Sequence, residues 1–87
     1  MAELGVRDVC DMLRDAVKFI EDEIAQKEER ITVLTARLHK LQSQPDPNPE
    51  QIAEIKADIQ ALEAQLKSDR PQLTAFKEEV QAICPPK

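Results

Sequence analysis

The sequence predicts an all-α protein: a single domain, residues 1–87, folded as an antiparallel two-helix coiled-coil hairpin. Two observations support this fold. Apolar residues recur at alternating spacings of three and four, which is the heptad pattern of coiled coils. A cluster of three prolines at alternate positions, within residues 44–49, divides the chain almost in half. Neither a helix nor a paired strand continues through such a cluster, so it predicts a turn.

Before the proline cluster, the pattern predicts a helix over about residues 3–43. The a and d positions of a heptad form the seam, which is the row of side chains that packs against the partner helix. The a positions are Cys10, Val17, Ile24, Ile31 and Leu38, and the d positions are Val6, Leu13, Ile20, Lys27, Leu34 and Leu41.

After the cluster, the pattern predicts a second helix over about residues 50–84. Asn48 suits the N-cap, and Pro49 suits the first helical position, where no amide donor is needed. Pro71 lies at an outward-facing f position, where it predicts either a kink near residues 69–70 or a break with a third helix capped by Ser68 or Asp69. The unbroken heptad favours the kink. The a positions are Ile52, Ile59, Leu66, Leu73 and Val80, and the d positions are Ile55, Leu62, Asp69, Phe76 and Ile83.

Nineteen of these 21 seam positions are apolar, and the short linker favours antiparallel packing of the two helices. Placing Leu41 opposite Ile52 makes the residue numbers of facing layers sum to 93, which sets Cys10 opposite Ile83. The two polar seam residues, Lys27 and Asp69, then fall in adjacent layers. We expect this pair to fix the register rather than to perform chemistry. On the flanks, this register brings Glu21 and Glu28 near Arg70 and Lys77, and Arg30 and Arg37 near Asp58.

The same register brings Cys10 and Cys84 side by side at the open end of the hairpin. Two interpretations stay open: a disulfide or redox-sensitive latch that closes the hairpin, and two buried reduced thiols. A zinc site is disfavoured, because only two thiolates are available and His39 lies near the opposite end. We therefore expect neither a metal nor a cofactor.

Composition disfavours several classes of function. One Gly, one His and no Trp or Tyr leave too few residues for a phosphate-binding loop, a base-stacking platform or a histidine-based triad, so we expect no enzyme and no catalytic residues. The net charge of −5 has no basic half, which argues against nucleic acid. No apolar run approaches the roughly 18 residues of a membrane span. No secretory signal is evident, so the chain is expected to be cytoplasmic, or extracytoplasmic if the cysteines are disulfide-bonded.

A second apolar stripe beside the seam indicates a partner. In the first helix it consists of Val9 and Ala16 at g positions and Met12, Phe19 and Val33 at c positions. The second helix adds small residues at c positions on the same side: Ala61, Ser68, Ala75 and Ala82. Alanine alone carries little weight, because it is the best helix former and fills surfaces readily. Large apolar residues at exposed positions indicate an interface more strongly.

The sequence therefore predicts a non-catalytic protein–protein interaction or assembly module. Its partner would be a second copy, giving a homodimeric four-helix bundle, or another helical protein. We expect the contact to be made by Val9, Met12, Ala16, Phe19, Ala75 and Ala82. An alternative is an exported, disulfide-closed hairpin that acts as a toxin-like or secretion-associated factor. A chaperone-like clamp is disfavoured, because residues 42–51 offer no exposed apolar tip.

Overall fold

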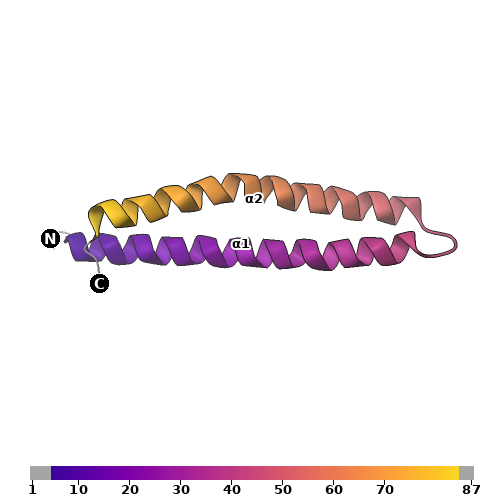
Figure 1. The fold of residues 1–87 in the computed structure, drawn as a ribbon, viewed down its shortest axis with the longest axis horizontal. Helices are drawn as coiled ribbons and strands as arrows, with labels where there is room; N and C mark the ends of the chain where they lie inside the picture. Colours follow the sequence, from indigo (N-terminus) through magenta and orange to yellow (C-terminus); the bar gives the residue numbers. More distant parts are fainter. Residues whose placement is uncertain (1–4, 85–87) are drawn as a thin grey trace.

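A computed structural model describes residues 5–84, except for the side chains of Val6 and Arg7, and within that range it contains two helices and no strand. Helix α1 spans Val6–Gln42 and helix α2 spans Pro49–Ile83. The helices run antiparallel along their whole length, with the turn at one end and the termini at the other (Figure 1). The molecule is a rod of 66 × 27 × 16 Å. The predicted all-α hairpin of two packed helices is confirmed.

The helix boundaries follow the local chemistry of the sequence. Gly5 is the N-cap of α1, which begins at Val6, and the Gly5 amide donates to the Asp8 carboxylate at 3.3 Å. The predicted helix start near Glu3 falls on residues 1–4, which lie outside the described part of the chain. At the start of α2, the Asn48 side chain accepts hydrogen bonds from the amides of Glu50 and Gln51, at 2.9 and 3.3 Å. This is the cap that the sequence predicted, and it satisfies two amides that have no partner within the helix.

Pro71 does not divide the second helix. α2 is a single helix through Pro71 to Ile83, so the expectation of a break with a third helix capped by Ser68 or Asp69 is wrong. Figure 1 shows α2 as one curved helix beside a straighter α1. The physical reason is the position of Pro71, which is exposed on the outside of the hairpin. Its ring therefore stays clear of the seam, and the packing of the seam on both sides holds the helix together.

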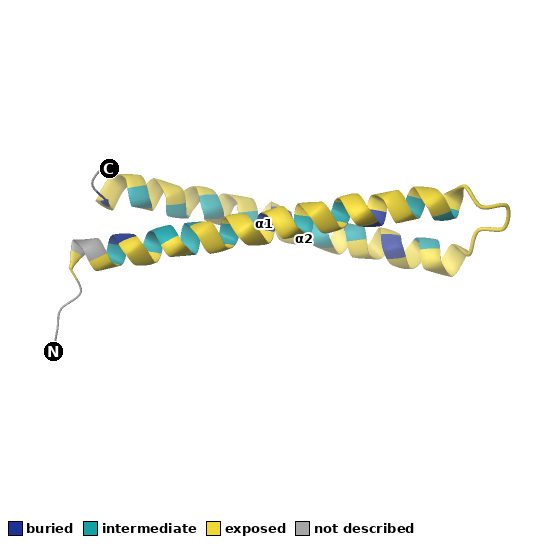
Figure 2. Cartoon of the chain, turned by 90° about the horizontal axis from the view of Figure 1, so that it is seen from below, coloured by how far each residue is buried: buried dark blue, intermediate teal, exposed yellow. Residues whose placement is uncertain are grey.

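The seam forms the core of the hairpin, as the heptad predicts. Every predicted seam residue whose side chain is described is buried or half-buried, with the exception of Ile83. Nearly all other described residues are exposed, and Figure 2 shows the covered residues as a line along the contact between the helices. The most deeply buried residues are Cys10, Ile24, Leu34, Ile55, Leu66 and Cys84. Because one narrow row carries the core, most of the surface of each helix remains free.

One predicted seam residue at the open end is not covered. Ile83 was expected to face Cys10 in the seam, but it is 44% exposed, and the buried residue there is Cys84. α2 ends at Ile83, and the backbone of Cys84 is extended, with φ −92° and ψ 139°. Once the chain leaves the helix, the heptad no longer determines which side chain points inward. Cys84 turns toward Cys10 and displaces Ile83 from the last layer.

Candidate functional site

The two polar residues of the seam form an ion pair at the middle of the hairpin. The Lys27 ammonium donates a hydrogen bond to Asp69 Oδ2 at 2.5 Å, across 42 residues of sequence. Their side chains are only 21% and 22% exposed. The long lysine side chain lies along the apolar seam and carries its charge to the carboxylate, so neither charge is left alone among apolar side chains.

The two cysteines are joined at the open end. A disulfide links Cys10 to Cys84 over a sequence separation of 74 residues, with the Cα atoms 5.6 Å apart. Both residues are buried, and Cys10 is the most buried residue of the described chain. The sequence left open whether these cysteines were bonded or reduced, and the structure places them in a disulfide that closes nearly the whole chain into a loop.

Ion pairs line one flank of the seam. Lys77 Nζ lies 3.3 Å from Glu21 Oε2, and Arg70 Nη2 lies 4.0 Å from Glu28 Oε2. Both ion pairs join α1 to α2, as the register predicted. These side chains are about half exposed, so the pairs contribute little stability and mainly favour the register.

The other flank has no such ion pair in the described chain. Arg30, Arg37 and Asp58 lie around one shallow hollow near the turn, but they form none of the ion pairs within 4.0 Å. The charges on this flank therefore remain available to an external partner.

The stripe predicted to bind a partner is exposed on α1. Met12 and Phe19, one heptad apart, are 62% and 64% exposed, and Val33 is 54% exposed. Val9 and Ala16, the g positions of this stripe, lie beside the seam and are half-buried. Met12, Phe19 and Val33, together with Ile83, are the exposed large hydrophobic residues of the described chain. Met12, Phe19 and Val33 lie outside the seam, so burying them requires another molecule.

The part of the same face contributed by α2 is built of small residues. Ala75 and Ala82 are exposed, as predicted for a surface free to bind. The neighbouring g positions are polar: Gln72 and Glu79 lie between these alanines and the seam, and both are exposed. The face is therefore not uniformly apolar. It consists of a column of large residues on α1 and a column of small residues on α2.

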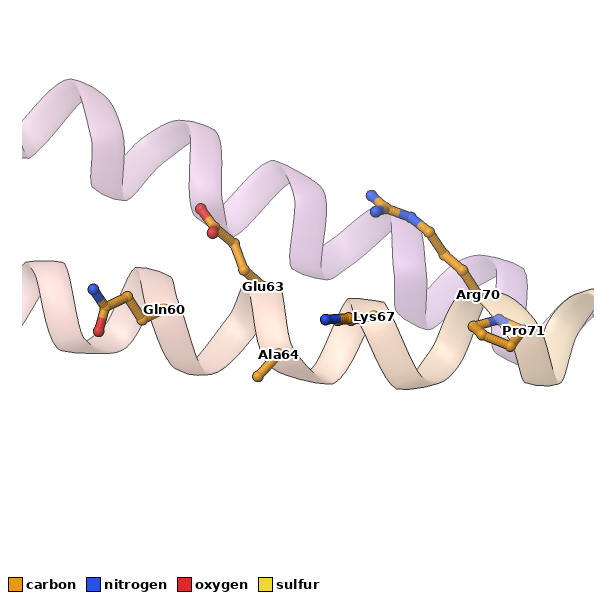
Figure 3. Close-up of a pocket in the computed structure, with 6 residues that line it drawn as sticks. All are labelled: Gln60, Glu63, Ala64, Lys67, Arg70 and Pro71. Carbon is orange, nitrogen blue, oxygen red and sulfur yellow. The ribbon is translucent and has the colours of Figure 1, made fainter.

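The surface hollows described on the hairpin are open to solvent. Figure 3 shows one of them, which belongs to α2 alone and is lined by exposed side chains, among them Lys67, Arg70 and Pro71. Sequence reasoning did not identify it, because all of its lining residues lie outside the seam, where the heptad gives no signal. A small-molecule site is normally concave and largely enclosed by apolar side chains, so this hollow does not define one.

The described residues also bear on metal binding and on membrane insertion. Residues 5–84 contain no group of three or more His, Cys, Asp or Glu side chains that could hold a metal ion. Neither α1 nor α2 is long and apolar enough to cross a membrane.

Comparison with known proteins identifies no relative: no family model matches the chain, and neither a curated protein nor a solved structure matches it significantly. The function must therefore be argued from the geometry of the hairpin itself.

Proposed function

We propose that this hairpin is a non-catalytic protein–protein interaction or assembly module. It binds a helical partner through its c and g face, in the half of the rod nearer to the open end. The observation that carries the proposal is the exposure of Met12 and Phe19, at 62% and 64%, on one side of α1. Together they form an exposed apolar patch on a rod whose other large apolar residues are mostly covered in the seam. Exposed large apolar residues that form a contiguous patch commonly mark interaction sites.

Binding would work by helix packing. A partner helix laid along α1 would cover Met12 and Phe19 and complete the partial cover of Val9 and Ala16. Burying a side chain of the size of Met or Phe contributes about 1.5–3 kcal/mol each, before the cost of association. Four helices in contact would also enlarge the narrow core of a hairpin that has a single seam.

The first experiment is sedimentation equilibrium of the wild type and of Phe19→Asp, with and without a reductant. We expect Phe19→Asp to abolish association, because a carboxylate would be buried without a partner, and to leave the monomer helical by circular dichroism. Gln60→Asp is the matched control, since it adds the same charge at an exposed position on the opposite side of the hairpin. Association that is unchanged in Phe19→Asp would contradict the proposed interface.

If the wild type does not self-associate, the face is reserved for another protein. The test then compares capture of a single partner by the wild type, by Phe19→Asp and by Gln60→Asp. Loss of that partner in the Phe19 variant alone would support the proposal, and equal capture by all three would refute it.

One observation favours the second candidate, an exported hairpin that acts as a toxin-like or secretion-associated factor. The disulfide between Cys10 and Cys84 is of the kind that persists in oxidising compartments and is rare in a reducing cytosol. Alkylation of free thiols in cells, followed by mass spectrometry of the protein, decides between the two settings. Fully alkylated cysteines would place the protein in a reducing compartment, whereas unreactive cysteines would favour export.

A further inference from the structure

The exposed face has a regular shape that determines how a second copy could lie on it. The disulfide sets Cys10 and Cys84 at one level of the hairpin, so Met12 and Ala82, each two residues inward, also share a level. Both are c positions of the heptad and belong to the same face. Moving inward by one heptad at a time gives five levels, which pair Met12 with Ala82, Phe19 with Ala75, Gln26 with Ser68, Val33 with Ala61, and Lys40 with Glu54.

Each level that contains an apolar pair has a large residue on α1 and an alanine on α2. We call the column of Met12, Phe19 and Val33 the ridge, and the column of Ala61, Ala75 and Ala82 the furrow. All six residues are exposed in the hairpin. The ridge and the furrow run along the two outer edges of one face, with the g positions and the seam between them, so this face carries both halves of a complementary shape.

We propose that the occupant of this face is a second copy of the chain, related by a two-fold axis parallel to the helices, with both turns at the same end; this pairing rests on the proposed function. The rotation places α1 of each copy over α2 of the other. A two-fold axis in this direction introduces no shift along the rod, so residues of one level meet residues of the same level. Phe19 of each copy then lies over Ala75 of the other, and the ridge enters the furrow twice.

The polar levels match in the same register. Gln26 faces Ser68 of the second copy, so an amide meets a hydroxyl. Lys40 faces Glu54 of the second copy, and neither residue takes part in an ion pair within the described hairpin. Five successive levels therefore bring together apolar with apolar, polar with polar, and opposite charges, although the register was fixed by the disulfide alone.

Near the turn, a second pair of charges supports the arrangement. Arg37 and Asp58 are g positions between the level of Val33 and Ala61 and the level of Lys40 and Glu54, and both are exposed and without an ion pair among residues 5–84. Across the proposed interface, Arg37 of one copy approaches Asp58 of the other. At the open end, the g position Glu79 of one copy faces Ala16 of the other, so this pair lacks an opposite charge.

A two-fold axis perpendicular to the helices fits less well. It would place α1 on α1 and α2 on α2, so Phe19 would meet Val33 while Ala61 met Ala75. Large residues would then pack on large residues along one side of the interface, and alanines on alanines along the other. This leaves either voids between the alanines or clashes between the large residues. Both are unfavourable in close-packed interfaces.

Disulfide trapping at the central level distinguishes the two arrangements. Gln26→Cys and Ser68→Cys are made in separate copies of the full chain, and one of the two carries a mass tag. We expect a cross-link between the two variants when they are mixed, and little cross-linking of either variant alone; peptide mapping verifies that Cys10 and Cys84 remain paired. Thr32→Cys mixed with Gln60→Cys is the matched control, since these exposed b positions lie on the opposite face. Cross-linking of Gln26→Cys with itself, or equal cross-linking of the control pair, would overturn the parallel arrangement.

A size swap tests the fit of the ridge in the furrow. Phe19→Ala should raise the dimer dissociation constant by about tenfold or more, because the symmetric dimer loses the same contact twice. Phe19→Ala combined with Ala75→Phe moves the large residue to α2 at the same level and should recover most of the affinity. Both positions lie outside the seam, and circular dichroism checks that each variant stays helical. A double variant as weak as Phe19→Ala alone would contradict the pairing.

The outcomes separate this pairing from the broader proposal. A wild type that stays monomeric at every concentration overturns the pairing, and the interface is then judged by whether Phe19→Asp loses a different protein partner. A wild type that dimerises through Phe19 but fails the trapping and the size swap supports the interface and overturns the parallel arrangement.

Discussion

Among single residues, Lys27 and Asp69 show most clearly how two polar residues in an apolar seam can satisfy each other. Each is an unfavourable residue for a seam when its own helix is considered alone. In the hairpin, the two side chains meet at 2.5 Å and are mostly covered. An ion pair of this kind contributes little net stability relative to well-packed apolar residues, but removing one partner leaves a covered charge unpaired. We therefore expect its main effect to be on register.

Lys27→Met should lower the free energy of unfolding by about 1–3 kcal/mol, because the Asp69 carboxylate loses its partner while remaining mostly covered. Urea denaturation measures the change. Lys77→Met is the matched control. The ion pair between Lys77 and Glu21 is half exposed, so its loss should lower the free energy of unfolding by no more than about 0.5 kcal/mol. Equal costs for the two variants would contradict a special role for the central pair.

The double variant Lys27→Leu/Asp69→Leu separates register from stability. It should be about as stable as the wild type or more stable, since two apolar side chains replace the ion pair. It should also re-form the disulfide between Cys10 and Cys84 more slowly from reduced protein, because slipped registers become accessible. A double variant that reoxidises as fast as the wild type would show that the apolar seam alone sets the register.

Among the elements, α2 shows how tertiary packing overrides a local signal. A proline inside a helix removes one backbone hydrogen bond and crowds the preceding turn, which is the reason that the sequence predicted a kink or a break at Pro71. The seam residues on both sides of Pro71, from Leu66 to Val80, are buried or half-buried, and a break would expose several of them. The helix therefore continues through Pro71, and the lost backbone hydrogen bond lowers the stability of the hairpin.

Replacing Pro71 with alanine should therefore raise the free energy of unfolding by about 1–3 kcal/mol, because the backbone hydrogen bond returns and the crowding ends. Chemical denaturation followed by circular dichroism measures it. Glu78→Ala, at another exposed f position of α2, is the control and should change stability by less than about 0.5 kcal/mol. A loss of stability in Pro71→Ala would mean that the proline favours the packing of the seam.

For the whole molecule, the disulfide determines how the rod is closed. The turn holds one end of the helix pair and the bond between Cys10 and Cys84 holds the other, so the 74-residue separation becomes a closed loop. Such a loop restricts the unfolded chain more than the folded one, and the chain-entropy estimate for this length is about 4 kcal/mol. In a hairpin with a single seam, that contribution is comparable to the total stability of many small domains.

Cys10→Ala/Cys84→Ala should accordingly lower the free energy of unfolding by about 4 kcal/mol, and a reductant should affect the wild type similarly. Thermal and urea unfolding measure the loss. Amide hydrogen exchange should show that protection falls first at the open end and last beside the turn. The reductant should not change the stability of the double alanine variant, and equal stability of the oxidised and reduced wild type would contradict this account.

The sequence by itself determined the two helices, the turn and the register through most of the hairpin, because heptad spacing is a periodic signal that many residues repeat. Nineteen apolar residues at 21 seam positions leave little freedom in how the helices face each other. The same periodicity correctly placed Lys27 beside Asp69 and the acidic and basic residues of one flank. It also identified Met12 and Phe19 as residues outside the seam.

Only the tertiary structure decided the points at which the periodic signal ends or competes with packing. The heptad assigned Ile83 to the last layer, but Cys84 occupies it, because the helix ends there and the extended backbone turns the cysteine inward. The continuity of α2 through Pro71 depends on contacts with α1 that no local pattern contains. The sequence predicted the exposed stripe of Met12, Phe19 and Val33 from their c positions, but only the tertiary structure decided how far each residue is covered, because that depends on how the two helices sit against each other.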